Sequence, residues 1–433
     1  MTNLAPATSI RKVLILGFVL VLVGVVAVLG SAGVANAAAI TVMNLHDSGP
    51  GSLRQAIANA SPGDTIDFAV TGTITLTSGE LVIDKDLTIN GPGAMNLSIS
   101  GNHASRVLNI FRGNFAISGV TIQHGRVVFG AGIFNLNGNV SISRSIISGN
   151  NATYQAGGIL NHNDTATLIL TDSLVIGNTA RDAAGGILNY RGSMTVTGTT
   201  ITRNTAGSAG GIRNEVDGAM IINNSTIKDN NAITGHAGGL DNHGIGLTVS
   251  GTTISGNTAA IAGGGIHSHE NAVLSLSNST ISGNTAGVEG GGLHVHGFAI
   301  LTNNTFNENA AGVRGGGIYS FHDGWVFMSN MIIANSPSGS DCMGATFASL
   351  GHNLDSDGTC NLTEPTDLSH TDPLLGSLRD NGGPSYTHAL MPGSPAIDAA
   401  KEVDTLETDQ RGVHRPQGAA FDIGSFERRS MAP

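Results

Sequence analysis

Apolar residues recur along the chain in three columns with a period of about 26 residues. A period of this length is typical of a solenoid or a propeller. The period is marked by asparagines at Asn150, Asn178, Asn204, Asn230, Asn257, Asn284, Asn309 and Asn335. The first apolar column follows a Gly-Gly pair and comprises Ile133, Ile159, Ile187, Ile212, Leu240, Ile266, Leu293 and Ile318. The second lies three residues before each asparagine and comprises Ile147, Val175, Ile201, Ile227, Ile254, Ile281, Phe306 and Ile332. The third lies five residues before the second and comprises Ile142, Leu170, Val196, Ile222, Val249, Leu276, Leu301 and Phe327.

Three short apolar strands per repeat predict an all-β solenoid, the parallel β-helix. Each column would stack from coil to coil at a spacing of about 4.8 Å and form a core that no single repeat could bury. The Gly-Gly pairs suit a backbone that turns with positive φ or packs closely on the next coil. Asn161, Asn189, Asn214 and Asn242 recur inside the coil, where amide ladders are expected. A β-propeller is the weaker alternative, because its blades need four strands and about 40 residues.

The segments around the repeats differ from them. Residues 1–37 carry a basic start, an apolar run and the small-residue site Ala35-Asn36-Ala37, which predicts a signal peptide; an uncleaved membrane anchor is the alternative. Residues 38–105 are expected to form an N-terminal cap and the first coils. Within them, Ser52 and Gln55 form a capping-box pattern before a short amphipathic helix, a suitable lid for the open end of a solenoid. Residues 106–335 hold the repeats, and prolines crowd residues 336–433.

Several motifs resemble known families. Gly51-Ser-Leu-Arg-Gln-Ala-Ile looks like the CSLREA-type N-terminal motif of secreted bacterial repeat proteins, with Gly51 and Gln55 in place of its Cys and Glu. The repeats resemble right-handed parallel β-helices of the pectate-lyase-like superfamily and polymorphic outer-membrane-protein repeats. Asp409-Gln-Arg-Gly and Asp422-Ile-Gly-Ser-Phe-Glu427 resemble the choice-of-anchor Q domain, which implies a surface-anchoring segment nearby. No hydrophobic tail follows before Pro433, so free secretion is expected rather than anchoring by this chain.

The charge of the chain limits the classes of binding partner that can be expected. The formal net charge of −11 argues against nucleic acid or an anionic membrane. Cys342 and Cys360 are the only cysteines, and in an exported protein they predict a disulfide rather than a metal pair. The expected protein is secreted or displayed at the cell surface, is a monomer, and has no stable membrane span in its mature chain.

The most unusual polar residues lie just after the Gly-Gly pairs. Residues two apart in a strand share a face, so four imidazoles should form a compact group on the outside of neighbouring coils. The group comprises His267, His269, His294 and His296, flanked by Asp241, His243 and Tyr319. Neutral imidazole is the commonest metal ligand, so one reading is a divalent-metal site of the zinc type. The others are a glycan platform of His and Tyr, or repetition of residue types from coil to coil without a ligand.

A second candidate metal site lies nearer the C-terminus. Asn353, Asp355, Asp357 and Glu364 approach the spacing of an EF-hand calcium loop. Neither flank reads as a helix, so the alternative is an Asx-rich turn held by the disulfide.

The outward positions of the repeats carry neither the carboxylate cluster of a calcium-dependent lyase nor the carboxylate pair of a glycoside hydrolase. No catalytic residue and no cofactor beyond a Zn or Ca ion is therefore predicted. The sequence favours a binding face for adhesion or for a carbohydrate or cell-surface ligand. The alternative is a polysaccharide lyase or glycoside hydrolase of the same fold.

Overall fold

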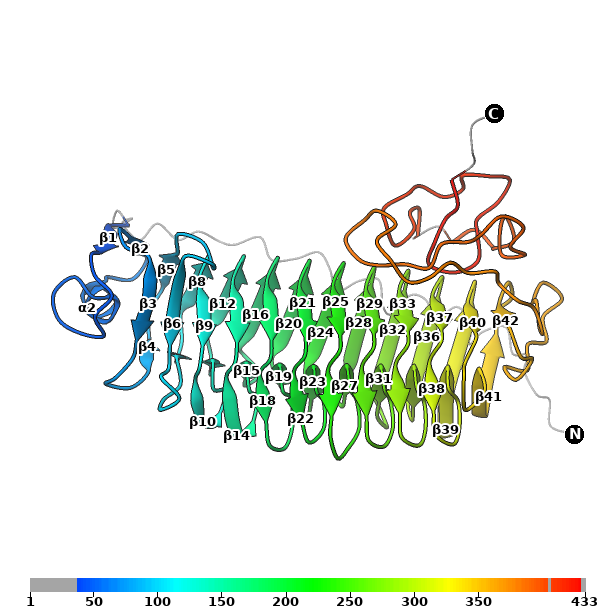
Figure 1. Ribbon diagram of the computed structural model, residues 1–433, viewed down its shortest axis with the longest axis horizontal. Coiled ribbons are helices and arrows are strands. Elements are labelled where there is room, and N and C mark those ends of the chain that lie inside the picture. The colour runs from blue at the N-terminus through cyan, green and yellow to red at the C-terminus, as the bar shows by residue number, and fades with distance from the viewer. Residues whose placement is uncertain (1–36, 404–405, 430–433) are drawn as a thin grey trace, which may run out of the picture. The chain divides into compact units, whose positions relative to one another are not determined.

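The computed structural model describes residues 37–403 and 406–429. The predicted signal peptide, residues 1–37, lies outside the described residues except for Ala37. The described chain is a right-handed parallel β-helix, in which each coil pairs with the next through parallel strands. One coil consists of β15 (Ile159–His162), β16 (Thr167–Thr171), β17 (Leu174–Ile176) and β18 (Thr179–Ala180). Figure 1 shows the equivalent strands of successive coils side by side. The predicted fold class is confirmed.

The three apolar columns form the core. Ile159 pairs with Ile187, Leu170 with Val196 and Val175 with Ile201, and all are fully buried. A fourth, two-residue strand such as β18 adds a further sheet of eight strands that the apolar pattern does not predict. Its core is made of alanines such as Ala152, Ala180 and Ala206, which are too small to stand out as an apolar column.

Two of the three predicted columns are wrong in the last repeat, whereas Ile318 of the first column pairs with Leu293 and is buried as predicted. Phe306 pairs with Ile333 and Leu301 pairs with Met328, so Ile333 and Met328 point inward where Ile332 and Phe327 were expected. Because side chains alternate between the two faces of a strand, a slip of one residue exchanges inside for outside. The slip came from aligning the repeat on an asparagine, Asn335, that is exposed and donates to Asn307 instead of continuing the ladder.

Two ladders of buried amides run along the stack. In one, each side-chain nitrogen donates to the next oxygen at 2.9–3.0 Å, from Asn150 to Asn309. In the other, the donor–acceptor distances are 2.7–3.0 Å, from Asn135 to Asn242. The predicted inward ladder is the second one. Because each amide bonds to both neighbouring coils, these ladders hold the register of the strands that carry the candidate site.

Glycine is required at the Gly-Gly pairs because the backbone of the next coil lies too close for a Cβ atom. A positive φ is not the reason. A Cβ added to Gly186 would lie 2.5 Å from the carbonyl oxygen of Gly211 on the next coil. Positive φ occurs one residue earlier, at Ala184 (59°) and its counterparts. There the chain turns so that the loop before it folds back over the outer face of the following strand.

The N-terminal end of the stack carries the predicted helix. α2 (Leu53–Asn59) begins after Ser52, whose hydroxyl accepts from the backbone N–H of Gln55 at 3.2 Å. Leu53, Ala56 and Ile57 are buried against the core, as the apolar stripe predicts. The helix lies beside β1 (Ala39–Val42) at one end of the β-helix (Figure 1).

The parallel ladder runs beyond residue 335. β39 (Ile318–Ser329) pairs with β41 (Cys342–Ser349), and β40 (Ile332–Ala334) pairs with β42 (Leu354–Asp355). The recognisable repeat therefore ends one coil before the β-helix does.

The remaining C-terminal segment packs on the outer face of one sheet. It covers a column of threonines on β29 (Thr253–Ser255), β33 (Thr280–Ser282) and β37 (Thr305–Asn307), whose side chains are buried beneath it. Gln410 accepts from Thr280 at 2.6 Å and donates to Thr253 at 3.1 Å. That sheet is not the one that carries the histidines.

The choice-of-anchor-like motifs hold this segment together. Arg415 and Glu427 form a fully buried ion pair at 3.1 Å, and Arg411 pairs with Asp409 at 2.6 Å. Among the described residues, no helix is long and apolar enough to cross a membrane.

Candidate functional site

The candidate site lies on the outer face of one ladder of strands, called here the site face. Its strands are β11 (Ile133–Asn135), β15, β19 (Ile187–Tyr190), β23 (Ile212–Glu215), β27 (Leu240–Asn242), β31 (Ile266–Ser268), β35 (Leu293–Val295) and β39. Strand pairing aligns one outward residue per coil into an inner row: Phe134, Leu160, Leu188, Arg213, Asp241, His267, His294 and Tyr319. An outer row lies two residues further along each strand: His162, Tyr190, Glu215, His243, His269, His296 and Phe321.

Six of the eight residues of the inner row are buried although they lie outside the coil interior, and the other two, Phe134 and Arg213, are half-buried. Asp241 and His267 are 1% exposed and His294 is 2% exposed, because the turn before the Gly-Gly pair folds over them. The residue at the positive-φ position of that turn is Gly263 opposite His267 and Gly290 opposite His294. A Cβ there would lie 2.6 and 2.7 Å from the respective histidine Cβ atoms.

The same position separates two kinds of coil. It is alanine opposite the aliphatic and charged members of the inner row, as at Ala184 before Leu188 and Ala237 before Asp241. It is glycine opposite every ring of the inner row. Besides the two histidine coils, this holds for Gly130 before Phe134 and Gly315 before Tyr319. Gly263, Gly290 and Gly315 each stand directly before a Gly-Gly pair and so form a run of three glycines. In these repeats the run of three is the sequence signal for a ring in the inner row.

One end of the site face is an aromatic groove of about 310 Å³. His162 stacks on Tyr190 with ring centres 5.0 Å apart, and Phe134 meets His162 edge-on at 5.9 Å. Arg106 lies over the Phe134 ring at 4.9 Å. Burial lowers the pKa of His162, so this ring is neutral and the groove is largely apolar.

The other end is organised around the carboxylate of Asp241. One oxygen, Oδ1, lies 3.1 Å from His267 Nδ1 and 3.2 Å from His269 Nε2. The other, Oδ2, lies 3.0 Å from His243 Nε2. One potential ligand atom from each of these four residues lies within 4.8 Å of all the others.

A second group follows on the next coil. His267, His294 and His296 also place one ligand atom each within 4.8 Å of the others. The rings of His267 and His294 stack in parallel, with centres 4.8 Å apart and planes at 5°, and Tyr319 continues the stack at 5.2 Å. The structure therefore gathers all six histidine and aspartate residues predicted on this face into two groups that share His267.

Four of the histidine rings, those of His267, His269, His294 and His296, are held in the neutral form. Burial lowers the pKa of His267 to about 3, although Asp241 opposes the shift. Burial, together with the neighbouring histidines, lowers the pKa of His294 to about 2. Burial likewise lowers the pKa of His269 and His296. For Asp241 burial acts to raise the pKa, but the hydrogen bonds with His243 and His267 outweigh burial and hold the pKa well below its usual value. A carboxylate among neutral imidazoles is the protonation state that a metal ion needs.

Two residues of this end were missed from the sequence. His236 stacks on His267 with ring centres 4.7 Å apart, and Glu289 lies 3.4 Å from His294 Nε2. Both stand immediately before the positive-φ residue, on the turn that covers the inner row. The outward rows that the sequence predicts begin after the Gly-Gly pair, so they do not include these two residues, which precede it.

Within the described residues, the four residues of the predicted calcium loop are not gathered into one shell. Asp355 accepts from the backbone N–H of Cys360 at 3.0 Å, and Asp357 accepts from Thr359 and from the N–H of Asp341. Asn353 bonds to Asp367 and to Met328, and Glu364 is exposed. The segment has the contacts expected of the alternative, an Asx-rich turn, because its carboxylates serve backbone and hydroxyl donors.

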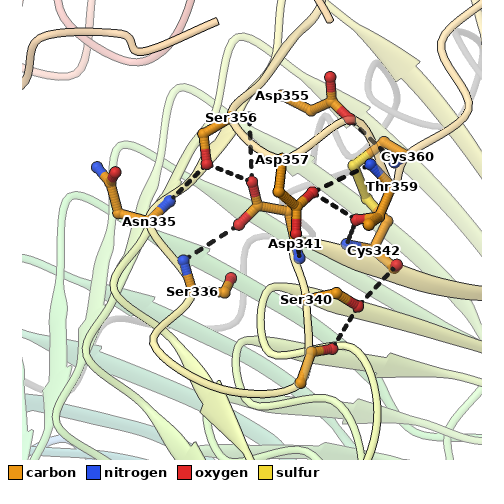
Figure 2. Close-up of a disulfide and its surroundings, with 11 residues drawn as sticks. Asn335, Ser336, Ser340, Asp341, Cys342, Asp355, Ser356, Asp357, Thr359 and Cys360 are labelled. Carbon is orange, nitrogen blue, oxygen red and sulfur yellow. Dashed lines mark hydrogen bonds between the residues drawn. A yellow bond between two sulfur atoms is a disulfide. The ribbon is translucent and has the colours of Figure 1, made fainter. Parts of the chain in front are cut away.

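The same turn contains the predicted disulfide, Cys342–Cys360, which is confirmed (Figure 2). The bond ties β41 to the turn that follows β42. Both cysteines are buried at the end of the apolar core.

No family model matches the sequence. Two curated proteins named "Probable pectate lyase C", from Aspergillus flavus and Aspergillus oryzae, are each 32% identical to the chain over 145 residues. The match covers 28% of this chain and 34% of each relative, so the chain spans about a third of the length of the curated relatives it matches. The crystal structure of pectate lyase Pel9A superposes with a TM-score of 0.49 at 15% identity, over 92% of this chain and 98% of that chain. The fold is established by the strand pairing described above.

Proposed function

We propose that this chain is an extracellular β-helix protein that binds a polysaccharide along the site face. The observation that supports the proposal is the aromatic groove, in which Phe134, His162 and Tyr190 from three successive coils form one continuous contact series. Binding sites are typically concave, rich in aromatic side chains and equipped with a few polar groups that orient the ligand. Arg106 and Gln155 supply those groups here.

The length of the face suits a polymer. Eight strands contribute to it, so seven steps of about 4.8 Å give a track of roughly 34 Å from Phe134 to Tyr319. Phe321, which is half-buried, places an aromatic ring at its far end as well. A small molecule would fill only a part of such a surface.

Secretion is part of the proposal. A disulfide persists in an oxidising compartment, and Cys342–Cys360 is formed. The signal-like pattern of residues 1–37 agrees with export. We further propose a monomer in which residues 38–105 cap the β-helix, residues 106–335 carry the site face, and residues 336–433 form the region that resembles a choice-of-anchor domain.

The second candidate function is a polysaccharide lyase. It is favoured by the partial similarity to two proteins named as pectate lyases. Against a calcium-dependent mechanism stands the donor chemistry, because both candidate metal groups within residues 37–403 and 406–429 contain histidine and neither is an all-carboxylate cluster. Adhesion to a surface glycan would use the same face without cleavage.

Binding is tested by titrating the secreted protein with a panel of acidic and neutral polysaccharides, using calorimetry. Tyr190→Ala should weaken binding at least about tenfold, since a stacked aromatic contact is worth on the order of 1.4 kcal/mol. Tyr386→Ala is the matched control, because this tyrosine is 51% exposed on the C-terminal segment, away from the groove. Equal affinity of both variants for every ligand would exclude the groove.

Catalysis is tested on the same panel by following 4,5-unsaturated ends and reducing ends. Binding without either product supports a binding protein. Release of unsaturated ends that is lost in Tyr190→Ala would favour the lyase instead.

A further inference from the structure

We propose that Asp241, His243, His267 and His269 form a binding site for one divalent transition-metal ion of the zinc class. The site joins two adjacent coils, because Asp241 and His243 follow from β27 whereas His267 and His269 follow from β31. It is independent of whether the site face binds a polysaccharide.

Three of the donor contacts are close in length to the edges of a tetrahedral shell, and one ligand atom from each of the four residues lies within 4.8 Å of the others. Zinc bonds of about 2.1 Å at tetrahedral angles place neighbouring ligand atoms about 3.4 Å apart. The carboxylate of Asp241 lies 3.0, 3.1 and 3.2 Å from the nearest nitrogens of His243, His267 and His269. Small rotations of these side chains would open the group enough to admit an ion.

The contact between His269 and Asp241 is not a hydrogen bond. Nε2 of His269 lies 3.2 Å from the carboxylate, yet this buried nitrogen has no hydrogen-bond partner. Nε2 of His267 also has no partner, but the nitrogen of that ring nearest Asp241 is Nδ1, so it is His269 that points to a ligand. A buried polar atom without a partner is unfavourable, so Nε2 of His269, held beside the carboxylate without a hydrogen bond to it, indicates an atom directed at a ligand.

The charge balance also favours a cation. Asp241 is a buried carboxylate, and its nearest cation, Arg213, lies 3.7 Å away and is paired with Glu215 at 3.2 Å. A divalent ion bound by the carboxylate would compensate the buried charge.

The donor set selects the metal. Three imidazole nitrogens and one carboxylate suit zinc and its neighbours, whereas calcium takes six to eight oxygens. The ion would be reachable, because His243 and His269 are half-exposed and line an open pocket of about 370 Å³ with His296 and Glu270. The neighbouring group of His267, His294 and His296 has beside it the carboxylate of Glu289, which already pairs with Arg314 at 2.9 Å; the ion is therefore assigned to the Asp241 group.

The test uses the untagged secreted protein, stripped with a chelator and titrated with Zn²⁺ by calorimetry at pH 7.5. The wild type should bind one ion per chain. Asp241→Asn and the double variant His243→Ala/His269→Ala should each bind Zn²⁺ at least about 100-fold more weakly. Loss of a residue that only hydrogen-bonds to a metal ligand already weakens metal binding by up to about 100-fold, and these variants lose ligands themselves. The double variant changes only half-exposed side chains, so it tests the site even if Asp241→Asn does not fold.

Two controls locate the ion. His162→Ala removes a histidine of the same face in the aromatic groove and should leave the affinity unchanged. His294→Ala/His296→Ala removes the second group and should still bind one ion. The visible spectrum of bound Co²⁺ should report tetrahedral coordination in the wild type and in both controls. Failure of the wild type to bind, wild-type affinity in the Asp241 and His243/His269 variants, or loss of binding only in His294→Ala/His296→Ala would overturn the proposal.

Discussion

Replacing Gly263 by alanine should displace His267 and destabilise its coil. Gly263 has φ of 67°, and a Cβ on it would lie 2.6 Å from the Cβ of His267 and 2.7 Å from the carbonyl oxygen of Ile266. The left-handed backbone costs about 1–2 kcal/mol for a residue with a Cβ. The overpacked contact adds about 1–3 kcal/mol, because both neighbours belong to a paired strand and cannot move freely. The expected loss is therefore roughly 2–5 kcal/mol.

The chain supplies a matched control. Gly283 has φ of 62° but no atom within 4 Å of its added Cβ, so Gly283→Ala carries the backbone term alone. The difference between the two variants isolates the contact with His267. Urea unfolding followed by circular dichroism measures both, and amide hydrogen exchange of β31 shows whether the loss is local. Equal destabilisation by the two variants would refute the argument that the ring needs a glycine opposite it.

Three further predictions follow from the packing. Asn204→Ala should cost on the order of 2–3 kcal/mol in urea unfolding, since it leaves the amide of Asn178 without its acceptor; an unchanged midpoint would contradict a structural role for the ladder. Cys342→Ser/Cys360→Ser should cost about 3 kcal/mol, to be compared with the oxidised wild type by the same assay; equal stability would refute it. Burial lowers the pKa of His388 in the folded state, where the ring lies 2.9 Å from Ser282. In the unfolded state the pKa of this histidine is about 6.5, so as the pH falls below that value the unfolded state takes up a proton before the folded state does. The stability from this neutral ring should be complete above that pH and decrease at lower pH, and His388→Gln should reduce the slope.

The repeat predicted the fold because one signal was present many times. Gly-Gly, three apolar columns and an inward asparagine agreed in every coil from Ile159 to Leu293, so the register of the site face and the proximity of its histidines could be derived from spacing alone. The last coil shows the limit of the method. There Asn335 is the residue type that marks the repeat, but it does not lie at the ladder position. Met328 and Ile333 therefore point inward, one residue later than the pattern predicts.

The depth of the site could not be derived in the same way. Alternation shows that His267 points out of the coil, but its burial depends on a turn that folds back over it. That turn also brings in His236 and Glu289, which stand before the Gly-Gly pair and so outside the repeating outward rows that follow it. The packing of the C-terminal segment on Thr253 and Thr280 was equally hidden, because threonine is as common on an exposed strand as on a covered one.

Anomalous diffraction from crystals grown with Zn²⁺ tests the central claim, a metal centre built by two coils of the β-helix. The structure predicts one strong zinc peak about 2.1 Å from donor atoms of Asp241, His243, His267 and His269. A peak coordinated only by His267, His294 and His296, or peaks confined to scattered surface residues, would contradict it.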